Sequence, residues 1–303
     1  MRKDKCKNDR LYFSFTSLSS NNTYSLRDAN HNENEIHYNV KERQTPESSA
    51  DFSFCFWKGC GGSGGGAILC ENHVSSSLSI TSCIFLSCTC SDTNGGAIYA
   101  REVSAFHCVT SFFHDCHSSK NDGGAIEALI ITHCNIISYC DFMNNTAILY
   151  GGSLVVANIK TTNCDNCFPA VVSECKFVAN SAAEGGGLHM RPCIDAHYIC
   201  DSLISSNRGT VGGGLQFWND VIQSVSSPSF SFLFFSGNSA TKGNDIIING
   251  TNIFSAQSFI HCFTTTLTNR IYPSGNDNWL PLASFHFHLP KIYHLTIITL
   301  HYN

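Results

Sequence analysis

Carboxylates are the first residues that could do chemistry, because pairs of Asp and Glu carry out acid–base catalysis in enzymes that cleave polysaccharides. Glu127 follows a Gly-Gly pair, and Asp115 and Asp141 lie near the predicted corners of adjacent repeats, where they could approach each other. An enzyme of this kind needs several acids converging on one exposed face, which the spacing does not indicate. We therefore expect no catalytic residues, and a polysaccharide lyase or glycoside hydrolase remains the alternative.

Metal-ligating side chains are the second candidates, with 17 Cys and 14 His in the chain. Cys164 and Cys167 form a Cys-x-x-Cys pair, but zinc would need a second pair or a nearby His at suitable spacing. The tail carries His286, His288, His294 and His301 at irregular spacing. We predict no metal site, no cofactor and thiols with a structural role.

The composition excludes one class of partner and leaves the location of the protein open. Charged residues make up 14% of the 303 residues and the net charge is -5, so the basic patch of a nucleic-acid binder is missing. The basic start is not followed by the apolar stretch of about 7–15 residues that a secretory signal requires. No run of about 18 apolar residues predicts a spanning helix. We leave open an intracellular chain, a surface protein and a fragment of a longer product, and the oligomeric state is unknown.

A repeat must position all of these residues. Gly-Gly-small-Ile/Leu recurs with spacings of 30, 28, 28, 34, 27 and 31 residues, the last step leading to a decayed copy at Gly243–Ile246. The copies contain Gly65, Gly66 and Ile68; Gly95, Gly96 and Ile98; Gly123, Gly124 and Ile126; Gly151, Gly152 and Leu154; Gly186 and Leu188; and Gly213 and Leu215.

A second motif, aromatic-x-x-Asn/Cys, precedes every glycine motif in register. Its members are Trp57 and Cys60, Phe85 and Cys88, Phe113 and Cys116, Phe142 and Asn145, Phe177 and Asn180, Ile204 and Asn207, and Phe235 and Asn238. Two motifs in register over seven copies indicate a true structural repeat.

The repeat predicts an all-β fold. Apolar residues alternate after each Gly pair, as in a β-strand, and about 28 residues with three short strands make one coil of a parallel β-helix. We predict a right-handed solenoid of about seven coils over residues 51–262, a polar N-terminal segment or cap over 1–50, and a C-terminal cap or tail over 263–303. A β-sandwich with accidental glycines is the alternative fold.

The motif residues have expected structural roles. The Gly pairs should turn corners where the backbone takes positive φ and neighbouring coils approach closely. Asn145, Asn180, Asn207 and Asn238 should form an internal ladder of side-chain amides. We expect the cysteines at the same position in the first three coils to act as small buried hydrophobes.

On these motifs, the chain resembles the polymorphic outer-membrane protein repeat family. The motifs GGA[ILV] and FxxN of that family stand here as GGAI at 65–68, 95–98 and 123–126, and as FMNN at 142–145, FVAN at 177–180 and FSGN at 235–238. Cys-rich surface proteins of parasitic protists have similar right-handed β-helix repeats. The resemblance implies surface display and adhesion.

The predicted function is therefore non-catalytic binding of an extended glycan or protein partner. The alternation after each Gly pair predicts an outward column that contains Tyr99, Glu127 and His189, together with Leu69, Val155, Gln216 and Ile247. Such a strip is long and shallow, unlike the closed pocket of a small-molecule site. We expect weak binding centred on Tyr99 and Glu127.

Overall fold

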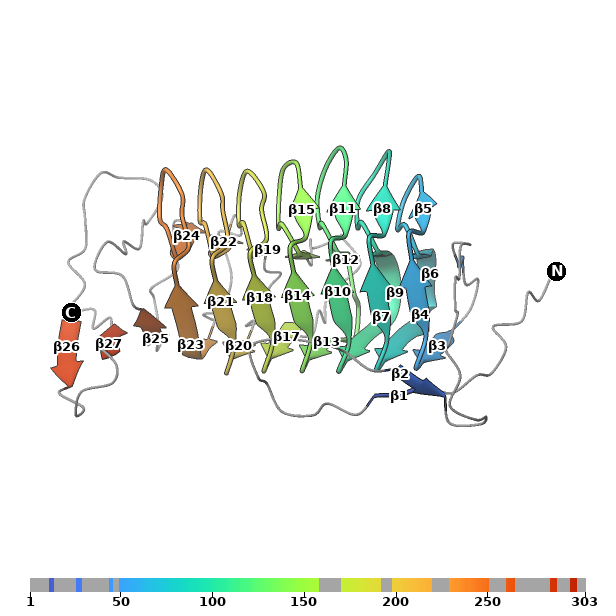
Figure 1. The fold of residues 1–303 in the computed structure, drawn as a ribbon, viewed down its shortest axis with the longest axis horizontal. Helices are drawn as coiled ribbons and strands as arrows, with labels where there is room; N and C mark the ends of the chain where they lie inside the picture. Colours follow the sequence, from blue (N-terminus) through green and yellow to red (C-terminus); the bar gives the residue numbers. More distant parts are fainter. Residues whose placement is uncertain are drawn as a thin grey trace.

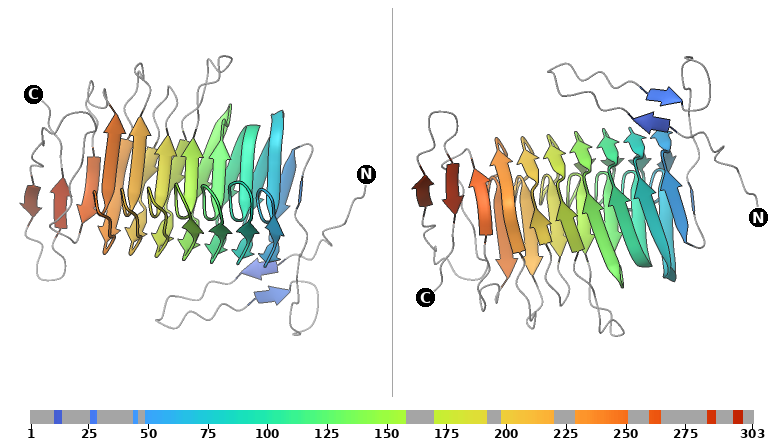
Figure 2. Two further views of the ribbon diagram at one scale, coloured as in Figure 1. Left: turned by 90° about the horizontal axis from the view of Figure 1, so that it is seen from above. Right: turned by 90° about the horizontal axis from the view of Figure 1, so that it is seen from below.

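The computed structural model describes residues 11–13, 26–28, 44–45, 49–157, 170–191, 198–219, 229–250, 260–264, 284–287 and 295–298. These residues contain strands and no helix. Most of them form a right-handed parallel β-helix whose rungs stack along the long axis of the molecule (Figures 1 and 2). Seven rungs are stacked in register, separated by six steps, so the predicted fold class is confirmed.

Each rung contributes strands to three positions around the helix. The glycine strands follow the Gly pairs: β6 (Ile68–Thr81), β9 (Ile98–Val109), β12 (Ile126–Leu129), β16 (Leu154–Ala157), β19 (Leu188–Arg191), β22 (Leu215–Asn219) and β24 (Ile246–Gly250). The second position holds β3 (Ala50–Ser53), the ends of β6 and β9, β13 (Cys134–Ser138), β17 (Ala170–Ser173), β20 (Tyr198–Cys200) and the start of β23 (Ser229–Ser236).

The aromatic strands carry the second motif: β4 (Phe56–Lys58), β7 (Ile84–Leu86), β10 (Phe112–His114), β14 (Asp141–Met143), β18 (Lys176–Val178), β21 (Leu203–Ser205) and the end of β23. The segment between each aromatic strand and the next Gly pair is called an arm below. The first four arms contain β5 (Gly61–Gly62), β8 (Thr89–Cys90), β11 (His117–Ser118) and β15 (Thr146–Ala147), which form a small parallel sheet (Figure 1).

Antiparallel strands occur outside the repeat. At the C-terminal end of the stack, β25 (Ile260–Thr264) pairs parallel with β23, and β27 (Leu295–Ile298) pairs antiparallel with both β25 and β26 (Ser284–Phe287) (Figure 1). In the N-terminal segment, β1 (Leu11–Phe13) and β2 (Leu26–Asp28) pair antiparallel.

The core contains the two continuous columns that the motifs predict. Ile68, Ile98, Ile126, Leu154, Leu188 and Leu215 are all buried and lie opposite one another in successive rungs. The rings of the aromatic column stack nearly parallel: Trp57, Phe85, Phe113, Phe142 and Phe177 have centroid separations of 4.6–5.0 Å. Burial of large side chains in every rung is the main favourable contribution to folding.

The Gly pair performs two different tasks, shown by the third rung. Gly123 has a φ of 62°, a left-handed conformation that costs a residue with a Cβ free energy. Gly124 has no room for a side chain, because a Cβ there would overlap the carbonyl oxygen of Gly152 and lie 2.7 Å from the backbone of Thr146. The expected corner and close approach are therefore both confirmed.

The Asn ladder also forms as predicted. The side-chain amide of Asn145 donates to Oδ1 of Asn180 at 3.1 Å, Asn180 donates to Asn207 at 3.0 Å, and Asn207 donates to Asn238 at 3.0 Å. Each Oδ1 also accepts a backbone N–H from the preceding rung. The Asn238 amide donates to the buried carboxylate of Asp245 at 2.8 Å. The ladder therefore satisfies backbone groups at a corner that regular pairing leaves open.

The buried cysteines are more than small hydrophobes. At a second corner, the backbone N–H of Cys55 donates to the thiol of Cys83 at 3.4 Å, and the N–H of Cys83 donates to Ser111 Oγ at 3.1 Å. The Cys83 thiol in turn donates to the carbonyl of Phe52 at 3.2 Å. Cys and Ser therefore do at this corner what Asn does at the other one.

Candidate functional site

The outward column of the glycine strands does not lie on the surface. Tyr99 is 6% exposed, Glu127 2% and His189 0%, and Val155 and Gln216 are buried with them. The prediction of a binding strip at Tyr99, Glu127 and His189 is therefore wrong, although the alternation along the strands is correct. These side chains point away from the helix interior, but the arms fold over them.

A second interior lies between the glycine strands and the arms, and it is called the seam below. Its strand column is Tyr99, Glu127, Val155, His189, Gln216 and Ile247, and its arm column is Asn94, Asp122, Tyr150, Glu184 and Val211. An arm residue meets the strand residue of the next rung: Tyr150 packs on His189 with ring centroids 4.6 Å apart, and Glu184 accepts a hydrogen bond of 2.7 Å from Gln216. The seam is therefore half polar, unlike the core.

His189 lies at the centre of a chain of hydrogen bonds in the seam, as a donor at one ring nitrogen and an acceptor at the other. Arg191 Nε donates to His189 Nε2 at 3.1 Å, so the proton of the neutral ring is on Nδ1, which donates to Gln216 Oε1 at 2.9 Å. Burial, and next the positive charge of Arg191, lower the pKa of His189 to about 3. The Arg191 guanidinium lies 4.4 Å over the Tyr150 ring. The histidine is therefore neutral and fully engaged, which suits a structural role.

Two carboxyl groups of the seam have raised pKa values. Burial raises the pKa of Glu127 well above its ordinary value, and the nearby charge of Asp122 adds to the effect. Burial raises the pKa of Asp122 to about 6, opposed by a hydrogen bond from the Tyr150 N–H. Oε2 of Glu127 is buried with no hydrogen-bond partner. These groups resemble a catalytic acid pair in their titration, but the arms keep Glu127 out of reach of a polymer.

We predict that Glu127→Gln stabilises the protein at pH 7 by about 1 kcal/mol or more, because it removes a buried carboxylate whose oxygen has no partner. A raised folded-state pKa means that the carboxyl group contributes stability below its unfolded pKa and that this stability is lost as pH rises through the folded pKa. The gain should therefore vanish near pH 4. Urea denaturation at pH 4 and pH 7 measures it, with Asp51→Asn, at an exposed carboxylate, as control. Equal stability of wild type and Glu127→Gln at both pH values would contradict this account of the seam.

The described residues contain no group of three or more His, Cys, Asp or Glu side chains that could hold a metal ion. Cys83, Cys88, Cys116, Cys140 and Cys175 are free and buried. Burial raises the pKa of the Cys140 and Cys175 thiols well above the ordinary value, so these thiols are poor nucleophiles.

The remaining candidates lie elsewhere. Asp115 lies 3.6 Å from His114 and Asp141 3.2 Å from Lys176. Cys164, Cys167, His288, His294 and His301 fall outside the described residues, and the surroundings of His286 are likewise not described.

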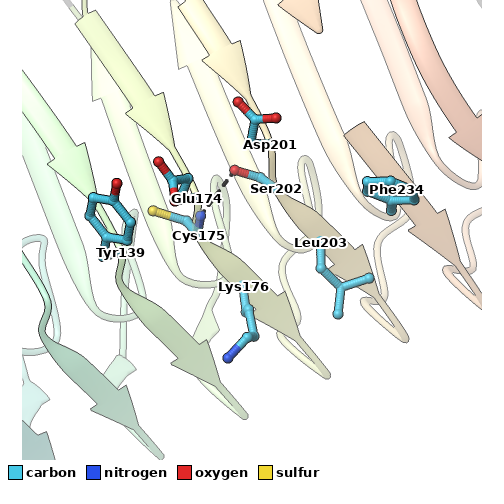
Figure 3. Close-up of a pocket in the computed structure, with 8 residues that line it drawn as sticks. All are labelled: Tyr139, Glu174, Cys175, Lys176, Asp201, Ser202, Leu203 and Phe234. Atoms are coloured by element: carbon cyan, nitrogen blue, oxygen red, sulfur yellow. Dashed lines mark hydrogen bonds between the residues drawn. The ribbon is translucent and has the colours of Figure 1, made fainter. Parts of the chain in front are cut away.

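An open hollow of about 540 Å³ lies on a different part of the surface, at the corner between the second strands and the aromatic strands. We call it the corner hollow; it is lined by Tyr139, Glu174, Cys175, Lys176, Asp201, Ser202, Leu203 and Phe234 (Figure 3). Tyr139, Glu174 and Asp201 occupy the same corner position in three successive rungs, each with positive φ. The buried Cys175 and Ser202 form its floor, joined by a hydrogen bond of 3.1 Å from the Cys175 N–H to Ser202 Oγ.

The electrostatics of the corner hollow are acidic. The N–H of Glu174 donates to the carbonyl of Cys200 at 3.1 Å, which places Glu174 and Asp201 in register in adjacent rungs. The Lys176 ammonium is bound to Asp141 at 3.2 Å. The pKa of the Tyr139 hydroxyl is raised by its hydrogen bond to Glu174 and by the charge of that residue. Exposed rings flank these acids, since Tyr139 is 55% and Phe234 46% exposed.

Sequence reasoning missed the residues of the corner hollow, although a signal for them exists. Tyr139, Glu174 and Asp201 directly precede the inward Cys/Ser column at 140, 175 and 202, and so share one outward position. When the repeats are aligned on the inward Cys/Ser position, the position directly before it contains an aromatic residue followed by two acids in successive repeats.

Comparisons with protein-family models, with curated proteins and with solved structures found no match to this chain. Among the described residues, no helix has the length and apolar character needed to cross a membrane.

Proposed function

We propose that this chain is a non-catalytic β-helix module that binds an extended glycan or protein partner along its corner hollow. The role of this binding is surface display or adhesion, as the resemblance to the polymorphic outer-membrane protein repeats implies. The observation that carries the proposal is the form of the corner hollow. It is open, runs along the stack over successive rungs and is flanked by exposed aromatic rings. Exposed aromatic side chains supply large contact area at a binding surface.

The burial of the seam argues against catalysis on the glycine strands. Glu127 and His189, which a catalytic strip on the glycine strands would use, are buried under the arms. The rigid ladder of the rungs instead presents side chains in fixed rows, about 4.8 Å apart from rung to rung. Such rows suit a long partner held by many weak contacts.

A carbohydrate-active enzyme is the second candidate, favoured by the two carboxylates that lie in register at the corner hollow. A pair of carboxyl groups about 5–10 Å apart is what glycoside hydrolysis requires. In that case Glu174 and Asp201, rather than Glu127, would be the catalytic pair.

One assay separates the two candidates. The full-length chain is tested on a panel of neutral, acidic and amino polysaccharides for retention by affinity electrophoresis and for release of reducing ends, and on immobilised peptides for binding. We expect binding without turnover, and we expect Tyr139→Ala combined with Phe234→Ala to weaken it. Val74→Ala, which truncates a side chain that is 61% exposed elsewhere, should leave binding unchanged. Turnover that Glu174→Gln or Asp201→Asn abolishes would replace the proposal with the enzyme.

A further inference from the structure

We propose that the corner hollow is the subsite for an arginine side chain carried by an extended segment of a partner protein. This inference rests on the proposed binding function and names its partner class. It uses the three features that the hollow combines: a pair of carboxylates in register, exposed rings on either side, and an open shape along the stack.

A cation bound between the two carboxylates would stabilise the pair. Like charges directly opposite each other on neighbouring strands repel, and Glu174 and Asp201 hold that relation at the corner. Neither carboxylate forms an ion pair within the part of the chain that the structure describes. Lys176, the one basic side chain lining the hollow, is bound to Asp141. A cation from a partner would relieve the repulsion and gain two charge-assisted hydrogen bonds.

The aromatic rings select the form of that cation. A guanidinium group is planar, stacks on aromatic faces and presents a fork of donors that can reach two carboxylates at once, whereas an ammonium group is a compact, strongly hydrated charge. Tyr139 lies beside Glu174 at one end of the hollow, and Phe234 lies at the other end (Figure 3). This chain already holds a guanidinium in such a manner, with Arg191 over Tyr150.

The open form of the hollow explains why the arginine should belong to a protein segment. The column continues past Asp201 to Phe232, which is 54% exposed, so apolar contact is available to the residues that flank the arginine. A neutral glycan would occupy the rings but leave both carboxylates without a counter-charge. The corner hollow therefore favours a basic peptide.

Fluorescence anisotropy with three labelled heptapeptides tests this inference on the full-length chain. The probes are Gly-Ser-Gly-X-Gly-Ser-Gly in which X is arginine, lysine or the neutral isostere citrulline. We expect the arginine peptide to bind about tenfold more tightly than the citrulline peptide, and more tightly than the lysine peptide. Glu174→Gln and Asp201→Asn should each weaken the arginine peptide about fivefold. Asp115→Asn is the matched control, because Asp115 is an exposed acid with positive φ at another corner, and it should have no effect.

Three results would overturn the inference: equal binding of the arginine and citrulline peptides, equal loss in Asp115→Asn and Asp201→Asn, or no binding of the arginine peptide at millimolar concentration. Thermal denaturation of each variant shows whether it is folded. If a polysaccharide binds in a manner that depends on Tyr139 and Phe234 while the arginine peptide fails, the inference falls and the proposed function stands. If neither binds, both fall.

Discussion

Replacing Gly124 with Ala should destabilise the protein by roughly 3 kcal/mol or more, or prevent folding. The added Cβ would overlap the carbonyl oxygen of Gly152 and crowd the backbone of Thr146, and neither backbone can move without disturbing the next rung. Urea denaturation followed by far-ultraviolet circular dichroism measures the loss.

Gly61→Ala is the control for this substitution. A Cβ at Gly61 would have Thr89 Oγ1 at 3.3 Å as its nearest neighbour, a side-chain atom that can shift, so the change should remain within about 0.5 kcal/mol of the wild type. Equal stability of Gly124→Ala and Gly61→Ala would show that adjacent rungs do not approach each other as closely as described.

Replacing Asn180 with Ala should cost roughly 2–4 kcal/mol, because the buried ladder then loses several partners at once. The backbone N–H of Asn145 loses its acceptor, and the carbonyl of Phe142 loses its donor. The Oδ1 of Asn207 loses the side-chain donor of residue 180 but keeps the backbone N–H of that residue. Denaturation in urea again measures the change.

Asn180→Cys distinguishes the ladder from simple space filling. A hydrogen bond with the Cys116 thiol, and next burial, raise the pKa of Cys88, whereas its thiol also accepts the backbone N–H of Cys60, which lowers that pKa. A thiol at position 180 should therefore serve the Asn145 N–H in part, and the loss should be smaller than for Asn180→Ala. If Ala and Cys are equivalent at this position, hydrogen bonding in the ladder contributes little.

The interior of the β-helix could be predicted from the sequence because each inward position recurs in seven copies of the repeat. The Ile/Leu column, the stacked rings and the Asn ladder all lie where their motifs indicate. Alternation within a strand also assigned Glu127 correctly to the face opposite the core. It did not reveal that this face is covered, because alternation describes one strand and not the segment that folds over it.

The arms illustrate why that covering is hard to predict. They pair mainly with the arms of adjacent rungs, through two-residue strands and single bridges, and such short pairings leave no periodicity in the sequence. The polar column of the seam, with Glu127 and His189, therefore reads as a solvated face. The corner hollow escaped prediction for a related reason: it is assembled from single residues at corners, such as Tyr139 and Asp201, rather than from a strand.

Hydroxyl-radical footprinting of the full-length chain, read by mass spectrometry, tests most directly whether the binding surface is the corner hollow or the glycine strands. Tyr139 and Tyr99 have the same intrinsic reactivity, but they are 55% and 6% exposed. The account predicts fast oxidation of Tyr139 and slow oxidation of Tyr99 in the free chain, and protection of Tyr139 but not of Tyr99 when a partner is bound. Fast oxidation of Tyr99 in the folded chain, with protection of Tyr99 by the partner, would contradict it.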